Sequence, residues 1–226
     1  MNVVITGISK GLGRALMNTF IKDEKISKIY GITSSSLSDE VIDHKVTLIK
    51  VNFLEPDFET EILKVIEDTP IHILINNAGY LKYEKFTDFN IQNYQKTFQI
   101  NFQAPATIIH ALLTNLINGK AHVINIGSMG GFQGSSKFPG LATYSASKSA
   151  LSTLTECLAE EFKEEGVKFN CLALGAVNTE MLRTAFPGFT TDTTPELMAK
   201  LIKDFSLNWG LQVNGQVYSM TAGNPG

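Results

Sequence analysis

Tyr144 and Lys148 are a pair of side chains whose types and spacing suit proton transfer. They are four residues apart within a helical pattern, so both lie on one helix face with Cβ atoms about 5–6 Å apart. The pKa of a free tyrosine is about 10, and lowering it by about three units requires about 4 kcal/mol of preference for the phenolate. A nearby lysine cation and the positive end of a helix favour that charged form. For these two residues alone, a surface helix pair without chemistry remains the alternative.

A glycine-rich segment follows the first apolar run, Asn2–Thr6. Its glycines, Gly7, Gly11 and Gly13, have the spacing TGxxxGxG, while Leu16 breaks the stricter GxGxxG pattern. Such a segment allows a tight turn, lets the backbone approach a phosphate closely and directs a helix N-terminus at the anion. Taken by itself, the segment is equally well explained as an ordinary glycine-rich turn between a strand and a helix.

Short apolar runs alternate with longer helical patterns along the chain, which predicts an α/β fold with a doubly wound parallel sheet covered by helices on both faces. The expected strands are Asn2–Thr6, Lys28–Thr33, Thr47–Asn52, Ile71–Asn76, His122–Gly127, Lys168–Leu174 and Gln216–Met220. The expected helices lie near Leu12–Asp23, Glu59–Glu67, Ile91–Ile117 and Thr143–Glu164. Because no linker or repeat interrupts the pattern, we expect residues 1–226 to form a single domain.

Two long irregular segments, near 129–140 and 178–205, follow strands at the sheet edge where ligands of parallel sheets bind, and are expected to form the substrate loops. Their large apolar residues indicate either an apolar pocket or loop-anchoring core; these are Met129, Phe132, Phe138, Met181, Phe186 and Phe189. Lys137 and Arg183 are the candidates to bind a charged substrate.

The composition excludes several classes of protein. The net charge of −3 offers no footprint for nucleic acid, and Cys157 and Cys171 form no disulfide framework. His44, His72, His110 and His122 lack ligand spacing, so we expect no metal site. The uncharged segment Thr97–Asn118 is long enough to span a bilayer but carries too many polar groups. Without a signal peptide or span, a cytoplasmic protein is expected.

Four motifs occur in a telling order: the glycine segment, Asn76-Asn77-Ala78-Gly79, Ile124-Asn125-Ile126-Gly127-Ser128, and Tyr144-Ser145-Ala146-Ser147-Lys148. In this order the chain resembles the short-chain dehydrogenase/reductase family from Met1 to Thr179, most closely the branch of carbonyl and 3-oxoacyl reductases. The resemblance implies a Rossmann-type fold with seven parallel strands. It also implies an NAD(P)(H)-dependent oxidoreductase that moves a hydride between a nicotinamide and a carbonyl or secondary alcohol.

The resemblance assigns catalytic roles residue by residue. Tyr144 is similar to the acid/base tyrosine, and Lys148 to the lysine that lowers the tyrosine's pKa and holds the nicotinamide ribose. Ser128 resembles the serine that stabilises the substrate oxygen. Ser135 and Ser136, which lie in the long segment after it, compete for this role. Asn101 resembles the asparagine that anchors a water in the proton relay.

The resemblance also implies a set of cofactor-binding residues besides Tyr144 and Lys148. These are Gly7, Ser9, Lys10, Gly11, Leu12, Gly13, Thr33, Ser34, Asn52, Phe53, Asn77, Ala78, Gly79, Gly175, Val177 and Thr179. Two positions depart from the family pattern: Asn52 replaces a common aspartate, and Leu174 replaces a common proline.

We expect the cofactor to be NADP(H) rather than NAD(H), with NAD(H) still possible. After the second predicted strand no carboxylate occurs before Asp39, so nothing there repels a 2′-phosphate. Hydroxyls of Thr33, Ser34 and Ser35 are suitable donors, and Lys10 matches a position that is basic in NADP-preferring members. A solvated loop lysine is the alternative for Lys10.

Two other functions on the same fold remain as alternatives. A catalytically silent NAD(P)-binding regulatory protein would often lack one of Ser128, Tyr144 and Lys148, and all three are present. An epimerase or dehydratase of the extended branch usually carries a larger substrate domain than 226 residues allow. We also expect a homodimer or homotetramer, because Thr97–Asn118 lacks the charged stripe of a helix packed on one side only.

Overall fold

A seven-stranded parallel sheet forms the centre of the computed structural model, which describes residues 1–35 and 43–221. Its strand order is β3-β2-β1-β4-β5-β6-β7. The strands are β1 Asn2–Thr6, β2 Lys28–Thr33, β3 Val46–Lys50, β4 Ile73–Asn76, β5 His122–Ser128, β6 Lys168–Leu174 and β7 Val217–Met220. The predicted α/β, Rossmann-type sheet with seven parallel strands is thereby confirmed.

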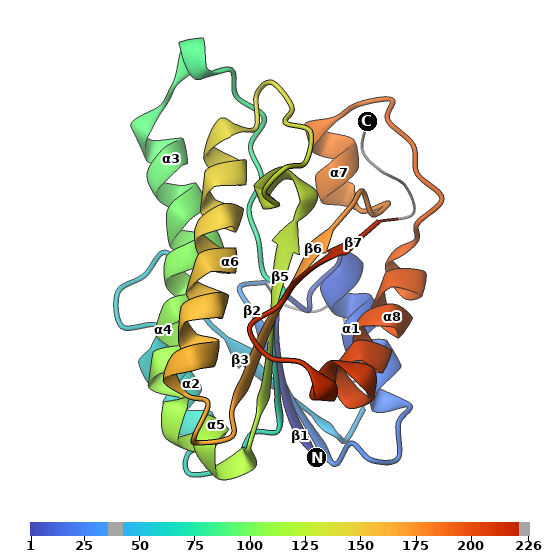
Figure 1. Cartoon of the computed structure of the whole chain (residues 1–226). Helices are drawn as coiled ribbons and strands as arrows, with labels where there is room; N and C mark the ends of the chain where they lie inside the picture. The colour runs from blue at the N-terminus through green and yellow to red at the C-terminus, as the bar shows by residue number, and fades with distance from the viewer. Residues whose placement is uncertain (36–42, 222–226) are drawn as a thin grey trace.

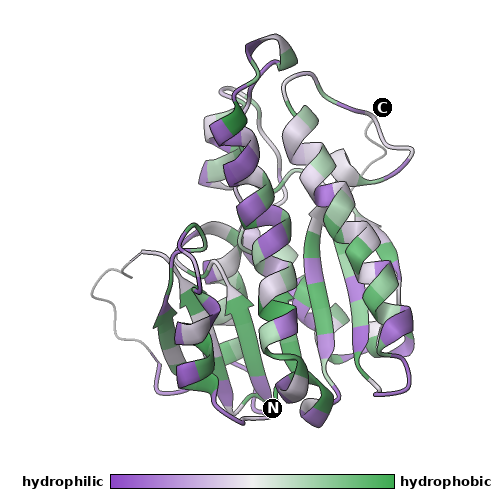
Figure 2. Cartoon of the chain, turned by 90° about the vertical axis from the view of Figure 1, so that its left-hand side faces the viewer, coloured by the Kyte–Doolittle hydropathy of each residue, from purple (hydrophilic) through white to green (hydrophobic). Residues whose placement is uncertain are grey.

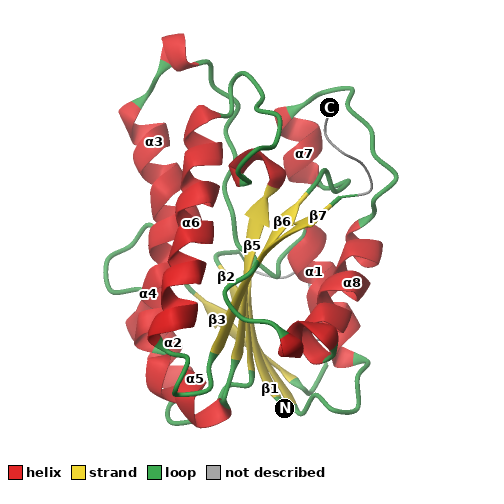
Figure 3. Ribbon diagram, viewed as in Figure 1, coloured by secondary structure: helices red, strands yellow, loops and turns green. Residues whose placement is uncertain are grey.

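Helices cover both faces of this sheet (Figures 1 and 3). One face carries α1 (Gly11–Ile21) and α8 (Pro195–Leu207). The other carries α2 Glu59–Ile66, α3 Ile91–Phe98, α4 Ala104–Ala111, α5 Leu113–Gly119 and α6 Ala142–Glu161. The short helix α7 (Glu180–Ala185) lies beyond the carboxyl ends of the strands.

Two apolar cores, one on each face, hold the helices to the sheet. Successive residues of β1 alternate between them: Val3 and Ile5 pack towards α1 and α8, and Val4 packs towards α2 and α4. Figure 2 shows the strands as mostly hydrophobic and the outer helix surfaces as mixed. Burial on both faces explains why the strands read as continuous apolar runs in the sequence.

The structure differs from the sequence expectation in two segments. The single helix expected at Ile91–Ile117 is divided by a π-helix, η2 (Gln99–Gln103), and by a break before α5. The expected loop at 178–205 instead contains α7 and most of α8. The start of α8 has a physical cause that the sequence displays: Thr194 caps the helix by accepting from the Leu197 N–H, and Pro195 occupies the first turn.

Within the described residues, no helix has the length and apolarity needed to cross a bilayer. The segment Thr97–Asn118 belongs to the end of α3, the π-helix, α4 and α5. Its apolar residues Ile108, Leu112 and Leu116 are fully or almost fully buried against the sheet.

Candidate functional site

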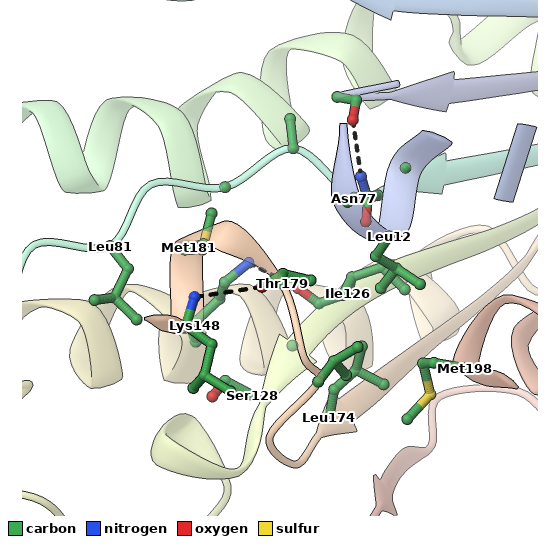
Figure 4. A pocket seen from close by; sticks show the side chains of 18 of the residues that line it. Leu12, Asn77, Leu81, Ile126, Ser128, Lys148, Leu174, Thr179, Met181 and Met198 are labelled. Atoms are coloured by element: carbon green, nitrogen blue, oxygen red, sulfur yellow. Dashed lines mark hydrogen bonds between the residues drawn. The ribbon is translucent and has the colours of Figure 1, made fainter. Parts of the chain in front are cut away.

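A cavity of about 1250 Å³ opens where the strands end, between the loops that follow β1, β2, β3, β4, β5 and β6. It is lined by every predicted site residue except Asn101. One end holds Ser128, Tyr144 and Lys148, and the other holds the turn between β1 and α1. Figure 4 shows Ser128 and Lys148 on one side of the pocket and Leu12, which follows that turn, on the other. Residues of six separate loops, scattered over the sequence, therefore share one site.

Ser128 and Tyr144 are brought together by the contact between η3 (Met129–Gly131) and α6. A Cβ atom added at Gly131 would lie 2.7 Å from the Ser149 nitrogen, so only glycine permits this close approach. A hydrogen bond with the Ser128 side chain lowers the pKa of Tyr144, but burial raises it by more, and the net pKa lies above its ordinary value. Tyr144 is thus a protonated acid in the cofactor-free protein.

Lys148 is 3% exposed, and its Nζ atom donates to the Ile126 carbonyl oxygen at 2.8 Å (Figure 4). Burial lowers the pKa of this lysine from 10.5 to about 8. In the cofactor-free protein burial raises the pKa of Tyr144 and Ser128 opposes it. That Lys148 lowers this pKa when the cofactor is bound stays a prediction.

Asn101 lies behind the cavity wall and is fully buried. Its Oδ1 accepts from the Tyr80 N–H at 2.7 Å, and its Nδ2 donates to the Tyr80 carbonyl and to Ser147 Oγ. Ser147 Oγ in turn donates to the Tyr144 carbonyl at 2.7 Å. These bonds join the segment after β4 to the first turn of α6, so that Asn101 positions the backbone of Tyr144. Its part in a proton relay stays a prediction.

The turn between β1 and α1 is packed against the Asn77 segment. Asn77 Nδ2 donates to the Thr6 carbonyl at 2.9 Å, and the Ala78 N–H donates to Thr6 Oγ1 at 2.9 Å. A Cβ atom at Gly13 would lie 2.0 Å from the Gly7 carbonyl oxygen, which excludes any other residue there. These contacts hold the β1–α1 turn and the segment after β4 at a fixed distance from each other.

Several features along the cavity, from the β1–α1 turn to Lys148, fit a dinucleotide. No side chain caps the N-terminus of α1, and no acidic residue stands in its first turn, so its N–H groups suit a pyrophosphate. A Cβ atom at Gly79 would project to within 3.7 Å of Lys148 Nζ, and its absence keeps the space beside this lysine open. Gly11 lies opposite Thr179 across the opening, and a Cβ atom added at Gly11 would lie 3.4 Å from the Thr179 methyl carbon.

The expected adenosine-side contacts are partly engaged within the protein. Asn52 Oδ1 accepts from the Leu54 N–H, and Asn52 Nδ2 donates to Glu55 Oε1. Thr33 Oγ1 donates to the Ser35 carbonyl at 2.9 Å. Asp39 and Ser36, which bear on the expected cofactor preference, lie outside the described residues.

Of the competing residues in the long segments, Ser135, Ser136, Lys137 and Arg183 do not line the cavity. Ser135 Oγ donates to the carbonyls of Met129 and Phe132. Ser128 is therefore the serine that faces Tyr144 within the cavity.

Several residues that line the cavity were not predicted from the sequence, among them Leu81, Leu141, Glu180, Leu197 and Leu201. Leu81 stands two residues after the Asn76–Gly79 motif, and this position was a usable signal. The lining residues of α8 lie in a segment that the sequence predicts as a loop, so no periodicity pointed to them. In the described part of the chain, no three His, Cys, Asp or Glu side chains are grouped to hold a metal ion.

A model of the short chain dehydrogenase family matches residues 1–188 of this chain. The chain therefore belongs to the short-chain dehydrogenase/reductase family, a family of NAD(P)-dependent oxidoreductases.

Curated relatives are distant. The chain is 26% identical over 187 residues to an uncharacterized oxidoreductase of Staphylococcus saprophyticus, with 79% of each chain covered. It is 28% identical over 218 residues to a chloroplastic NADPH-dependent aldehyde reductase-like protein of Arabidopsis thaliana, covering 88% of this chain and 77% of that one.

Solved structures share the fold at lower identity. A 4-hydroxyisoleucine dehydrogenase complexed with NADH superimposes with a TM-score of 0.85 at 21% identity, covering 98% of this chain and 97% of that chain. ElxO with NADP bound superimposes with a TM-score of 0.83 at 23% identity, covering 97% and 96%. The likeness at these identities demonstrates the common fold.

Proposed function

We propose that this chain reduces a carbonyl compound, or oxidises the corresponding secondary alcohol, as a member of the carbonyl and 3-oxoacyl reductase-like branch. The observation that carries the proposal is the meeting of Ser128, Tyr144 and Lys148 at one end of a cavity whose other end suits a dinucleotide. NAD(P)(H), when bound, supplies or accepts the hydride.

In the reducing direction, Tyr144 donates its phenolic proton to the oxygen that gains negative charge. Its raised pKa keeps that proton in place at neutral pH. Ser128 donates a hydrogen bond to the same oxygen and so stabilises the charge as it develops. Lys148 supplies a buried cation beside the tyrosine and, through its position next to Gly79, a donor for the ribose hydroxyls.

The proposed preference for NADP(H) over NAD(H) rests on Lys10 and on the hydroxyls of Thr33 and Ser34, which line the cavity. To donate to a phosphate, the Thr33 hydroxyl must exchange its hydrogen bond with the Ser35 carbonyl oxygen. One relative is named as NADPH-dependent and one similar structure is complexed with NADH, so the preference is a property to be measured on this chain.

The function is tested by following the absorbance of reduced nicotinamide while purified protein is mixed with a panel of aldehydes and ketones. We expect substrate-dependent oxidation of NADPH. Tight cofactor binding without turnover on any carbonyl or alcohol would instead identify a catalytically silent NAD(P)-binding regulatory protein.

We further propose a homodimer or homotetramer built through α4 and α6. Cys157 and Ala146 are exposed on α6 in the single chain, and His110 and Thr114 are exposed on the uncharged segment beside it. Small and uncharged residues on neighbouring helices suit a helix-to-helix contact between copies.

A further inference from the structure

The cavity continues past Tyr144 into a region whose walls are apolar. This substrate-side region lies between the segment 129–141, the segment after β4, and α7 with the loop behind it. Its lining side chains are Leu81, Met129, Phe138, Leu141, Met181, Leu182, Phe186 and Phe189. In Figure 4, Leu81 and Met181 lie at the end of the pocket that holds Lys148 and Ser128.

Charge is almost absent from these walls. Among the described residues that line the whole cavity, the charged ones are Lys10, Lys148 and Glu180. Lys10 and Glu180 pair with each other at 2.9 Å, and Lys148 donates to the Ile126 carbonyl. Lys10 and Glu180 thus compensate each other, and the Lys148 cation lies at the reacting end, so the apolar walls themselves present no charge to a substrate carboxylate, phosphate or ammonium group.

The two cations suggested by the sequence are directed elsewhere. Lys137 Nζ donates to the Phe132 carbonyl at 2.6 Å and to Ser135 Oγ at 2.8 Å. Arg183 donates to Asn178 Oδ1 at 2.7 Å. Since neither residue lines the cavity, both serve to hold the loops that surround it.

Several lining residues at the mouth are also exposed to solvent. Phe138 is 48% exposed, Phe189 51% and Leu197 50%, and Met181 and Leu201 are exposed as well. Apolar side chains gathered around an opening favour a ligand that covers them with apolar surface. A charged ligand would lose its hydration there without gaining a partner.

The outer wall is held by one aromatic contact. The ring of Tyr83 packs on Gly140 so closely that a Cβ atom there would lie 2.4 Å from the ring, and Phe186 of the α7 side meets Tyr83 edge-on at 6.0 Å between centroids. Tyr83, which is itself exposed, thus joins the segment 129–141 to the α7 side and holds the two walls of the substrate end together.

We infer that the substrate is an uncharged aldehyde or ketone whose carbonyl carries a large apolar group, either a long alkyl chain or an aryl ring. This inference rests on the proposed function. The carbonyl oxygen lies at Tyr144 and Ser128, and the apolar group occupies the region of Leu141, Met181 and Phe186.

The test compares two ketones of equal chain length, octan-2-one and 7-oxooctanoate, which differ by a carboxylate in place of the terminal methyl. We expect kcat/KM to be at least about a hundredfold higher for octan-2-one, because the carboxylate finds no partner in the region. A kcat/KM for 7-oxooctanoate that equals or exceeds that of octan-2-one overturns the inference.

A matched pair of variants locates the effect. Met181 is 39% exposed and lines the cavity, whereas Leu63 is 38% exposed on α2 and does not. Met181→Arg is expected to raise kcat/KM for 7-oxooctanoate at least about tenfold and to lower that for octan-2-one. Leu63→Arg is expected to change neither, and a Leu63→Arg variant that copies the effect of Met181→Arg contradicts the assignment.

Calorimetry separates this inference from the proposed function. If neither ketone is turned over, binding of both is measured in the presence of oxidised cofactor. Tighter binding of octan-2-one then supports the apolar substrate region while the proposed reaction fails. Equal or tighter binding of 7-oxooctanoate rejects the apolar region itself.

Discussion

The Lys10 ammonium lies 2.9 Å from the Glu180 carboxylate, although 170 residues separate them in the chain. The pair joins the residue before α1 to the first residue of α7, across the opening of the cavity. Both side chains are largely exposed, 68% and 62%, so the pair contributes little to folding stability. The pair matters for cofactor binding, because the Glu180 carboxylate partly neutralises the Lys10 charge that is proposed to bind a 2′-phosphate.

Cofactor preference is therefore expected to respond in opposite directions to the two partners. Lys10→Ala removes the proposed charge-assisted contact and should lower the NADPH to NADH ratio of kcat/KM by about tenfold to a hundredfold. Glu180→Gln frees Lys10 and should raise that ratio. Steady-state kinetics with both cofactors measure it, and a ratio that neither variant changes refutes the role proposed for Lys10.

Tyr144→Phe is expected to retain less than a tenth of wild-type turnover while cofactor affinity changes little, because the hydroxyl is needed for the proton. In the wild type, the raised pKa of Tyr144 predicts that reduction stays nearly constant through neutral pH. Alcohol oxidation needs the phenolate and should increase with pH. Cofactor titration by fluorescence and pH–rate profiles in both directions check these expectations, and substantial residual turnover in the variant rejects the mechanism.

At pH 7 the buried Lys148 is expected to lower the free energy of unfolding of the cofactor-free protein. Its folded pKa of about 8 lies below the unfolded value of 10.5, so the unfolded chain binds more protons between these pH values. The free energy of unfolding therefore rises with pH in this window, by up to about 3 kcal/mol. Lys148→Met should abolish turnover, weaken cofactor binding and remove this contribution to the rise.

Urea unfolding of the cofactor-free protein at pH 7, 8, 9 and 10 measures the effect. The exposed Lys82→Met variant is the control and should keep the wild-type pH dependence. If the free energy of unfolding of Lys148→Met changes with pH as it does in the wild type, the buried lysine does not lower stability at pH 7.

The proposed oligomer is checked by light scattering at micromolar concentration, where we expect a dimer or tetramer mass. Cys157→Arg places a charge on the exposed face of α6 and should shift the mass towards the monomer. Glu165→Arg, exposed beyond the end of α6, should leave the mass unchanged. A monomeric wild type contradicts the proposal.

Local pattern was enough to predict the sheet and most of the helices. The strands are buried on both faces, so their apolar runs stand out in the sequence, and the Tyr144–Lys148 spacing follows from the geometry of one helix. The glycines at positions 7 and 13 mark a turn where backbones meet too closely for any side chain. Family resemblance then connected these segments to a common reaction.

The sequence by itself determined the fold class, the family and the motifs that gather at the carboxyl ends of the strands, because short-range periodicity and motif order carry that information. Only the tertiary structure decided which charges are engaged. Lys10 forms an ion pair with Glu180, and Arg183 donates a hydrogen bond to Asn178. Burial lowers the pKa of Lys148 and raises that of Tyr144. Pairing and desolvation depend on neighbours brought from distant parts of the chain, and no local pattern records them.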